Sequence, residues 1–209
     1  MDVFCIHLPH RTDRMENIKK LQRFYPSINF HIVEGVRHER GATGCALSHQ
    51  KIIRMAKEQK RPYVWVIEDD CKLLHANGAL LTYVNEIAKF IAANPNVGIV
   101  NGCGNLDPYQ IDSVKPAGGM FFLKSPRVLT AHCIFYTAAC YDAFLALDPS
   151  GDAIDESTNS MNMVYTFPFL ATQVTSYSDI SKKDADYDNI SMSSRFITYT
   201  LKEEGFLNK

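Results

Sequence analysis

The stretch at residues 63–70, with sequence YVWVIEDD, constrains the fold most, because an apolar run ends there in three consecutive carboxylates. β-Branched and aromatic residues favour a strand, and an apolar run without alternation is typical of a strand covered on both faces. Such strands occur in the parallel sheets of α/β domains. Glu68, Asp69 and Asp70 follow the carboxyl end of this predicted strand, which is the sheet edge where α/β domains bind ligands. We therefore expect the three carboxylates to face a crevice.

The acidic triplet also suggests a cation. Adjacent carboxylates repel one another, and an ion shared between two of them relieves that repulsion. Carboxylate oxygens suit hard ions such as Mg²⁺ or Mn²⁺, which keep open positions for phosphate oxygens. The alternative is a solvated acidic turn without a metal, and the local pattern leaves both interpretations open.

Length, charge and cysteine usage exclude several classes of protein. A chain of 209 residues suits one large α/β domain, or one with a small appendage. A net charge of −1 provides no basic field for nucleic acid and no polybasic patch for a membrane. No apolar run approaches the roughly 20 residues that span a bilayer. Six scattered cysteines without a CxxC pair are typical of reduced thiols, which predicts a cytoplasmic location.

The first half of the chain alternates between strand and helix patterns. Apolar periodicity predicts strands at residues 3–8, 28–33 and 63–68, and helices at residues 12–25, with Thr12 as N-cap, and 43–59. This βαβαβ order favours a parallel, nucleotide-binding type of sheet.

The second half is less regular. The patterns predict a helix at residues 80–91, a strand at 97–100, a polar flexible loop at 101–116, two strands around Ser125-Pro126, a helix at 141–147 and a last strand at 163–167. The tail beyond residue 181 has weak periodicity, and His132 is expected to be an ordinary core residue.

The familiar phosphate-binding loops are absent from the sequence. Neither NGCGN nor RGATG fits G-x-G-x-x-G, and no Walker motif occurs, which argues against ordinary NAD enzymes and P-loop kinases. The junction at residues 41–48 instead offers the N-terminus of a helix to a phosphate or a ribose. Cys45 with His49, and Cys71 with His75, could in principle supply four zinc ligands, but the usual pairing of short spacings is missing.

Five segments in order resemble glycosyltransferase family 25. IHLPHRTDR resembles the family's opening I-N-L-D-R-R-x-D-R, GATGCALSH its G-x-x-G-C-x-x-S-H, and VIEDD its apolar-EDD strand end. AIDE and VYTFPFLATQVTSYSDIS resemble its late acidic motif and closing segment, so the matches run from about residue 4 to residue 181. Pro9 and His10 depart from the family's Asp-Arg, where the nucleotide base should lie.

The resemblance implies a single α/β domain of the GT-A type. Its sheet would be Rossmann-like and mainly parallel, flanked by helices, with a mixed C-terminal part. Residues 1–100 would form the nucleotide-sugar-binding half, and residues 101–209 the acceptor-side half and tail. The chain is short for this family, which is compatible with one module of a longer protein.

The implied activity is that of a metal-dependent hexosyltransferase. A sugar would move from a UDP-sugar donor to a hydroxyl of a glycan or glycoprotein acceptor, with inversion at the anomeric centre. Neither nucleic acid nor a membrane span is implied, and for a viral protein the cytoplasm would be the host's. Two alternatives stay open, namely a non-catalytic module that binds a nucleotide sugar or metal, and a nucleotidyltransferase.

The resemblance also assigns residues to roles. Asp70, assisted by Glu68, would hold Mn²⁺ or Mg²⁺. Asp155 would be the general base, with Glu156 as its close rival and a helix cap as the alternative role. The expected donor-binding residues are His7, Leu8, Arg11, Glu34, Gly35, Gly44, Ser48, Glu68 and Asp69. Arg11 and Arg14 suit phosphate or carboxylate groups, although Arg14 is equally well explained as surface charge.

Overall fold

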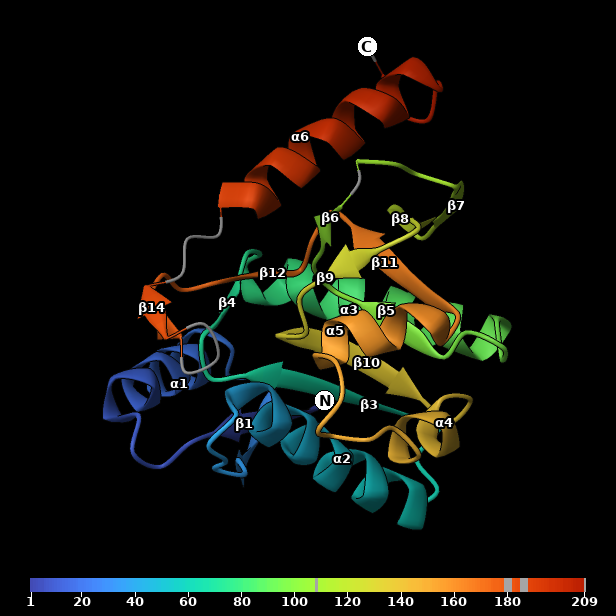
Figure 1. The fold of residues 1–209 in the computed structure, drawn as a ribbon. Helices are drawn as coiled ribbons and strands as arrows, with labels where there is room; N and C mark the ends of the chain where they lie inside the picture. Colours follow the sequence, from blue (N-terminus) through green and yellow to red (C-terminus); the bar gives the residue numbers. More distant parts are fainter. Residues whose placement is uncertain (108, 179–181, 185–187, 209) are drawn as a thin grey trace.

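The computed structural model describes residues 1–107, 109–178, 182–184 and 188–208. Its centre is an eight-stranded sheet in the order β2-β1-β3-β10-β5-β11-β8-β7 (Figure 1). The strands are β1 (Asp2–His7), β2 (Asn29–Glu34), β3 (Tyr63–Glu68), β5 (Ile99–Asn101), β7 (Ser113–Ala117), β8 (Met120–Lys124), β10 (Cys133–Thr137) and β11 (Met163–Phe167).

Helices and short strand pairs surround this sheet. The α-helices are α1 (Thr12–Phe24), α2 (Gly41–Glu58), α3 (Asn77–Ala93), α4 (Tyr141–Leu145), α5 (Ile154–Ser157) and α6 (Asp188–Glu203), with a 3₁₀ turn at Thr158–Ser160. The paired short strands are β4 (Cys71–Leu73) with β12 (Ala171–Gln173), β6 (Asn105–Leu106) with β9 (Val128–Leu129), and β13 (Tyr177–Ser178) with β14 (Lys183–Asp184).

The predicted α/β class is confirmed, with a parallel N-terminal part and a mixed C-terminal part. β1 pairs in parallel with both β2 and β3, and its Ile6 lies opposite Val33 and Glu68. The carboxyl ends of these three strands therefore meet at one sheet edge. β10 then runs antiparallel between β3 and β5, and further antiparallel pairs follow at β8 and β7.

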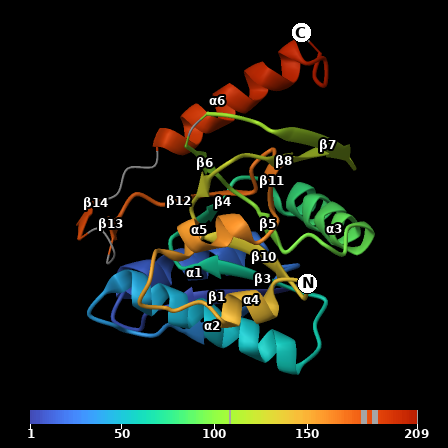
Figure 2. The same cartoon turned by 45° about the vertical axis from the view of Figure 1, so that its right-hand side comes forward.

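Both faces of β3 are buried, as its unbroken apolar run predicts. Trp65 and Ile67 pack in the core beneath α1 and α3, whereas Val64 and Val66 pack in the core beneath α2 and α4. The ring of Trp65 stacks on Phe135 of β10 at 5.2 Å between centroids. Figure 2 shows the sheet between these helix layers. The acidic triplet thus follows a strand that is buried on both faces and paired on both edges.

Two local predictions were wrong. Thr12 is the first residue of α1 rather than its N-cap, and the N-cap Arg11 makes no capping hydrogen bond through its side chain. Residues 101–116 are not one loop, because they contain β6 and most of β7. Among the described residues, β7 is an edge strand that pairs with β8 alone. A polar face at a sheet edge accounts for the loop-like composition.

The tail contains a 16-residue helix that the weak periodicity did not predict. The buried side chains of α6 include Ile190, Ile197 and Leu201, which pack over β6 in a third core cluster. Met192 and Tyr199 on the same helix are exposed, so apolar residues on two faces obscured the pattern. No helix in the described part of the chain is long and apolar enough to cross a membrane.

Candidate functional site

A cavity of about 530 Å³ opens at the carboxyl ends of β1 and β3. Its walls come from the turn after β1, the loop before α2, the first turns of α2, the acidic triplet, and the segment around β13. The lining residues are Ile6, Leu8, His10, Arg14, Val36, Arg37, His38, Glu39, Gly41, Gly44, Cys45, Ser48, Glu68, Asp69, Asp70, Gln173, Tyr177, Ser178 and Lys182. The acidic triplet therefore faces a crevice, as the strand pattern predicts.

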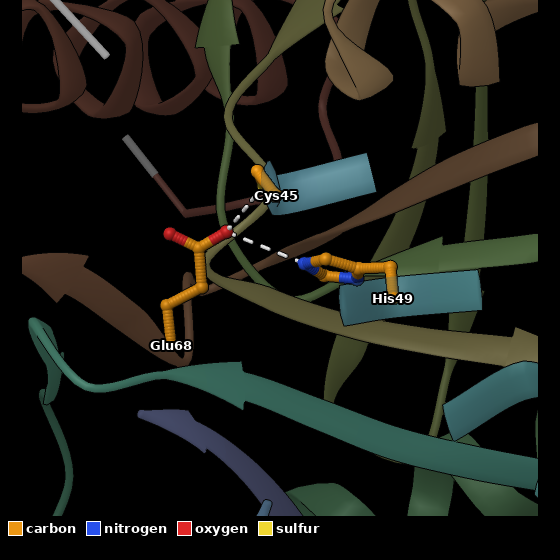
Figure 3. Close-up of side chains that lie close together, drawn as sticks. All are labelled: Cys45, His49 and Glu68. Carbon is orange, nitrogen blue, oxygen red and sulfur yellow. Dashed lines mark hydrogen bonds and ion pairs between the residues drawn. The ribbon is translucent and has the colours of Figure 1, made fainter. Parts of the chain in front are cut away.

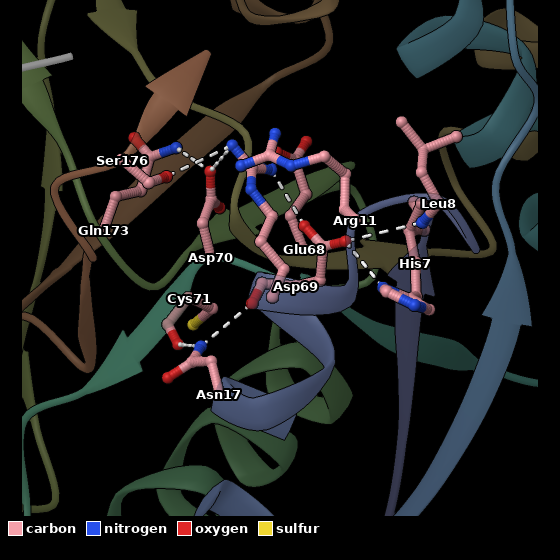
Figure 4. A network of polar contacts seen from close by, with 12 residues as sticks. His7, Leu8, Arg11, Asn17, Glu68, Asp69, Asp70, Cys71, Gln173 and Ser176 are labelled. Atoms are coloured by element: carbon pink, nitrogen blue, oxygen red, sulfur yellow. Dashed lines mark hydrogen bonds and ion pairs between the residues drawn. The ribbon is translucent and has the colours of Figure 1, made fainter. Parts of the chain in front are cut away.

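Asp69 is a buried carboxylate whose two oxygens are both bonded within the protein. His7 Nδ1 donates to Oδ2 at 2.8 Å (Figure 4). Arg14 Nη1 donates to Oδ1 at 2.8 Å. The amide of Leu8 adds a 3.4 Å contact, and Asn17 Nδ2 holds the Asp69 carbonyl at 2.9 Å. These bonds tie the turn after β3 to the start of α1. Asp69 and His7 thus hold the acidic triplet in place against β1 and α1.

The negative charge in the neighbourhood of Asp70 exceeds the positive charge that its partners supply. Arg14 Nη2 lies 3.2 Å from Oδ2, Gln173 Nε2 lies 3.4 Å from the same oxygen, and the buried Oδ1 has no hydrogen-bond partner among the described residues. Burial and the charges of Glu68 and Asp69 raise the pKa of Asp70 to about 7, although Arg14 opposes the shift. An unsatisfied oxygen in an acidic, partly enclosed setting is suited to a hard dication.

Glu68 points to the opposite side, toward α2. Its Oε1 accepts the Cys45 thiol at 3.4 Å and lies 3.3 Å from His49 Nε2 (Figure 3). The other ring nitrogen of His49 is hydrogen-bonded to the Tyr136 hydroxyl at 2.9 Å. Burial opposes ionisation of Glu68, but the His49 contact prevails and lowers the pKa of Glu68 to about 2. Glu68 is therefore an ionised carboxylate in a wall of the cavity.

Arg14 has a larger role at the site than Arg11. Arg14 contacts Asp69 and Asp70 and also donates to the Tyr177 carbonyl at 3.0 Å. Arg11 is engaged by Asp13 through Nε and Nη2, and its Nη1 reaches the Tyr177 carbonyl at 3.0 Å. Arg11 does not belong to the cavity wall. The interpretation of Arg14 as surface charge was wrong, and the signal for its role was Asn17, one helical turn later and also directed at the triplet.

Gly44 and Ser48 shape the second wall of the cavity. The Ser48 hydroxyl accepts the Val36 amide at 2.8 Å and donates to the Gly44 carbonyl at 2.7 Å. A Cβ atom on Gly44 would lie 2.5 Å from the Val36 carbonyl, so only glycine permits this close approach. Both residues line the cavity and hold the basic loop with Arg37 against α2.

Four of the expected donor-binding residues, namely His7, Arg11, Glu34 and Gly35, do not line this cavity. Gly35 is packed between Ile6 and Leu8, and its amide donates to the His7 carbonyl at 2.8 Å. The Glu34 side chain is exposed and borders a separate hollow beside α1. The strand order explains why residues at the end of β2 lie away from the acidic triplet, because β1 lies between β2 and β3.

The two late carboxylates have different surroundings. Asp155 Oδ2 accepts the Thr130 amide at 3.1 Å, and its Oδ1 accepts the Glu156 amide at 3.1 Å. Burial raises the pKa of Asp155, and its charge acts on the Cys45 thiol in the cavity wall. Glu156 instead forms an ion pair with Arg127, which lowers the pKa of Glu156. Asp155 is not the cap of α5, whose N-cap is Ala153.

The four-ligand zinc site considered from the sequence does not form. Cys71 and His75 do not join Cys45 and His49, because His75 Nε2 bonds the Phe169 carbonyl at 2.7 Å.

The buried His132 is not a satisfied core residue. No hydrogen bond of normal geometry reaches either ring nitrogen within the described residues, and burial lowers the pKa of His132 to about 4. Asp179 and Ile180 of the closing segment lie outside the described residues.

Comparisons with known proteins give structural similarities that are partial. No protein-family profile and no curated protein sequence matches the chain. A glycosyltransferase involved in the glycosylation of the major capsid of PBCV-1 is similar at a TM-score of 0.40 and 15% identity, covering 68% of this chain and 62% of that one. Mannose-1-phosphate geranyltransferase from Thermus thermophilus is similar at a TM-score of 0.37 and 10% identity, covering 78% of this chain and 68% of that one.

The chain thus spans less than two thirds of the length of the capsid glycosyltransferase. Transferase activity is a property of these two neighbours.

Proposed function

We propose that the chain is a metal-dependent glycosyltransferase that moves a sugar from a UDP-sugar to a hydroxyl of a glycan or glycoprotein, with inversion. One observation carries the proposal, namely the unsatisfied and charge-crowded Asp70 in a cavity that also contains the cationic side chains of Arg14, Arg37 and Lys182. A diphosphate needs cationic groups, and a buried carboxylate with a raised pKa needs a cation. A metal–diphosphate complex satisfies both requirements at once.

Asp70 and Glu68 would hold the ion in this proposal, with Asp70 Oδ1 as the principal ligand. Mn²⁺ or Mg²⁺, when bound, neutralises charge on the diphosphate and so improves UDP as a leaving group. Arg14 keeps the Asp70 carboxylate in place by contacting its other oxygen. Asp69 contributes by anchoring Arg14 rather than by touching the ion.

The basic loop and the apolar wall would bind the rest of the donor. Arg37 and His38 are exposed at the cavity rim, where they can contact phosphate oxygens. His38 Nδ1 accepts the Arg40 amide at 3.1 Å, so its Nε2 is the ring nitrogen that would face a phosphate. Ile6 and Leu8 provide apolar surface in the same cavity for a nucleobase. Gly44 allows the loop to lie close to α2 and thereby sets the width of the cavity.

Asp155 would act as the general base for the acceptor. Two backbone amides fix its carboxylate, and its raised pKa increases its affinity for a proton. The acceptor hydroxyl would transfer its proton to Asp155 as its oxygen attacks the anomeric carbon, while the bond from that carbon to UDP breaks. Attack opposite the leaving group inverts the anomeric centre.

The resemblance suggests a specific acceptor to test. Within family 25, the sequence resembles the N-terminal domain of a large chlorovirus capsid-protein glycosyltransferase. A capsid glycoprotein, modified in the host cytoplasm, is accordingly the acceptor that we would examine first. The resemblance alone supports this narrower assignment.

A non-catalytic nucleotide-sugar-binding module is the second candidate. It is favoured by one observation, since Asp155 does not line the cavity that contains the acidic triplet. Such a module would bind UDP with metal but would neither hydrolyse nor transfer the sugar. A nucleotidyltransferase is less well supported, because the turn after β1 has no glycine to grip a phosphate.

A ligand screen followed by a turnover assay tests these candidates. UDP-, GDP- and CMP-sugars are compared by thermal unfolding with and without Mn²⁺, because a ligand that binds only the folded state raises its stability. We expect a UDP-sugar to raise Tm only in the presence of metal and to be slowly hydrolysed. Binding without any turnover would favour the module. If no nucleotide sugar changes Tm under either condition, both candidates are wrong.

A further inference from the structure

A second group of potential metal ligands lies beside the acidic triplet but on its α2 side. Cys45 and His49 are four residues apart on α2 and therefore share one face of the helix. That face meets Glu68 at the end of β3, and one ligand atom from each residue lies within 4.8 Å of the other two (Figure 3). Glu68 is the one residue of this group that the proposed hard-ion site at Asp70 shares.

Two of the three ligand separations match the edges of a tetrahedral metal site. Zinc bonds of about 2.3 Å to sulfur and about 2.0–2.1 Å to nitrogen or oxygen give ligand separations of about 3.6 Å for sulfur to oxygen and about 3.4 Å for nitrogen to oxygen. The corresponding separations are 3.4 Å from Cys45 Sγ to Glu68 Oε1 and 3.3 Å from His49 Nε2 to Glu68 Oε1. The two edges that include Glu68 Oε1 thus need little adjustment to bind a metal ion.

The surroundings provide the remaining features of a zinc site. His49 Nδ1 contacts the Tyr136 hydroxyl at 2.9 Å, and this outer contact can carry the Nδ1 proton while Nε2 faces the metal. Cys45 and Glu68 both line the donor cavity, so a metal ion held between them would be reached from that cavity. A thiolate, a carboxylate and a neutral imidazole around a dication have zero net charge, which suits the buried setting.

We propose that Cys45, His49 and Glu68 form a binding site for a borderline-soft dication of the Zn²⁺ class, separate from the hard-ion site at Asp70 and open to the donor cavity. Binding forms a sulfur–metal bond and releases the Cys45 thiol proton to solvent. Because Glu68 belongs to both sites, Zn²⁺ binding should compete with Mn²⁺-dependent donor binding. Only this last consequence rests on the proposed function, since metal binding by the three side chains does not.

Cobalt substitution tests the site directly. Metal-free protein is titrated with Co²⁺, and thiolate-to-cobalt charge-transfer absorption should appear with one ion per chain and disappear when Zn²⁺ is added. The Cys45→Ser variant should lose this absorption and bind Zn²⁺ more than about 10-fold more weakly, since even outer-shell changes cost 10- to 100-fold. Cys140→Ser is the matched control, because Cys140 is a buried thiol bonded to the Thr137 carbonyl, and it should keep the absorption.

A second measurement avoids dependence on folding of the variants. Of the six cysteines, Cys45 alone is half-buried, so it is the thiol that a small alkylating reagent should reach first in the wild-type protein. Zn²⁺ should protect this thiol, and Mg²⁺ should not. Cobalt binding without thiolate absorption, unchanged Zn²⁺ affinity in Cys45→Ser, or equal alkylation with and without Zn²⁺ would each overturn the proposal.

An Asp70→Asn variant separates this proposal from the proposed function. It should lose Mn²⁺-dependent UDP binding and retain the cobalt–thiolate absorption, because Asp70 is not a ligand of the soft site. If UDP-sugars fail to bind while the absorption appears, the soft site stands and the glycosyltransferase proposal is wrong. If the absorption is absent while UDP-sugars bind, the reverse holds.

Discussion

Arg14 lies with its Nη2 atom 3.2 Å from Asp70 Oδ2, so the carboxylate at the centre of the site has one neutralised oxygen and one unsatisfied oxygen. The guanidinium also contacts Asp69, and it therefore divides one positive charge between two buried carboxylates. Because Glu68 adds a further negative charge, the group is acidic overall. The excess negative charge should therefore affect metal binding and the pH dependence of stability.

Replacing Asp70 with asparagine should abolish Mn²⁺-dependent UDP binding while preserving the fold. A neutral amide is a poor ligand for a hard dication, and removing one charge relieves repulsion among the remaining carboxylates. Calorimetric titration of UDP with and without Mn²⁺ measures the first effect. Undiminished metal-dependent binding would contradict the assignment of Asp70.

The same variant should change the pH dependence of stability in the metal-free protein. The pKa of Asp70 is raised from 3.8 to about 7 in the folded state, so the folded protein binds more protons than the unfolded chain in that interval. Stability contributed by Asp70 therefore falls as pH rises from about 4 to about 7. Denaturant unfolding should show Asp70→Asn to be more stable than the wild type at pH 8 and nearly equal to it at pH 4.

Removing the positive charge of Arg14 should destabilise the protein. Arg14→Met leaves Asp69 and Asp70 without their shared partner, and breaking a buried ion pair costs about 3 kcal/mol. The loss should be smaller at pH 5, where Asp70 can be protonated. Urea unfolding at pH 5 and pH 8 measures this difference, with Arg14→Lys as the charge-retaining control. Equal stability of Arg14→Met and wild type at pH 8 would show that the contact contributes nothing.

Asp155→Asn should reduce sugar transfer by about 10²- to 10⁴-fold, the usual contribution of a general base, while UDP binding stays unchanged. Glu156→Gln should reduce it much less, because the Glu156 carboxylate is held by Arg127. Steady-state kinetics with a saturating donor measure both variants. A strong loss in Glu156→Gln alone would move the role by one residue, and two active variants would place the base elsewhere.

His132→Leu should stabilise the protein in mild acid. The pKa of His132 falls from 6.5 to about 4 on folding, so the unfolded chain binds more protons between these values. The stability that this effect gives is complete above about pH 6.5 and is lost as pH falls toward 4, by about 3 kcal/mol. Leucine does not titrate, and the difference in unfolding free energy between variant and wild type should grow over that interval. A constant difference would contradict the prediction.

Local pattern predicted the parts of the fold that depend on neighbouring residues. The burial of Trp65 on one face of β3 and Val66 on the other follows from an apolar run without alternation. The position of Asp70 beside a cavity follows from strand polarity. These features need no knowledge of distant segments.

Features that depend on distant segments were not predictable in the same way. Gln173 reaches Asp70 across 103 residues of sequence, and Arg14 reaches Asp69 across 55. Hydrophobic periodicity describes neighbouring residues and cannot identify such distant partners. Glu34 illustrates the opposite error, since it follows a correctly placed strand but lies one strand too far from the site. The helix α6 was missed because exposed Tyr199 and Met192 masked its buried face.

The place of β10 between β3 and β5 has a consequence for synthesis of the protein. β3 emerges from the ribosome long before residues 133–137, so its apolar edge stays unpaired while the intervening segment is translated. Such nonlocal pairing slows folding. Asp70 likewise lacks its Gln173 contact, and Arg14 its contact with the Tyr177 carbonyl, until those residues have been synthesised. The nascent chain therefore carries an unpaired strand edge and an incomplete acidic site until its C-terminal part has been made.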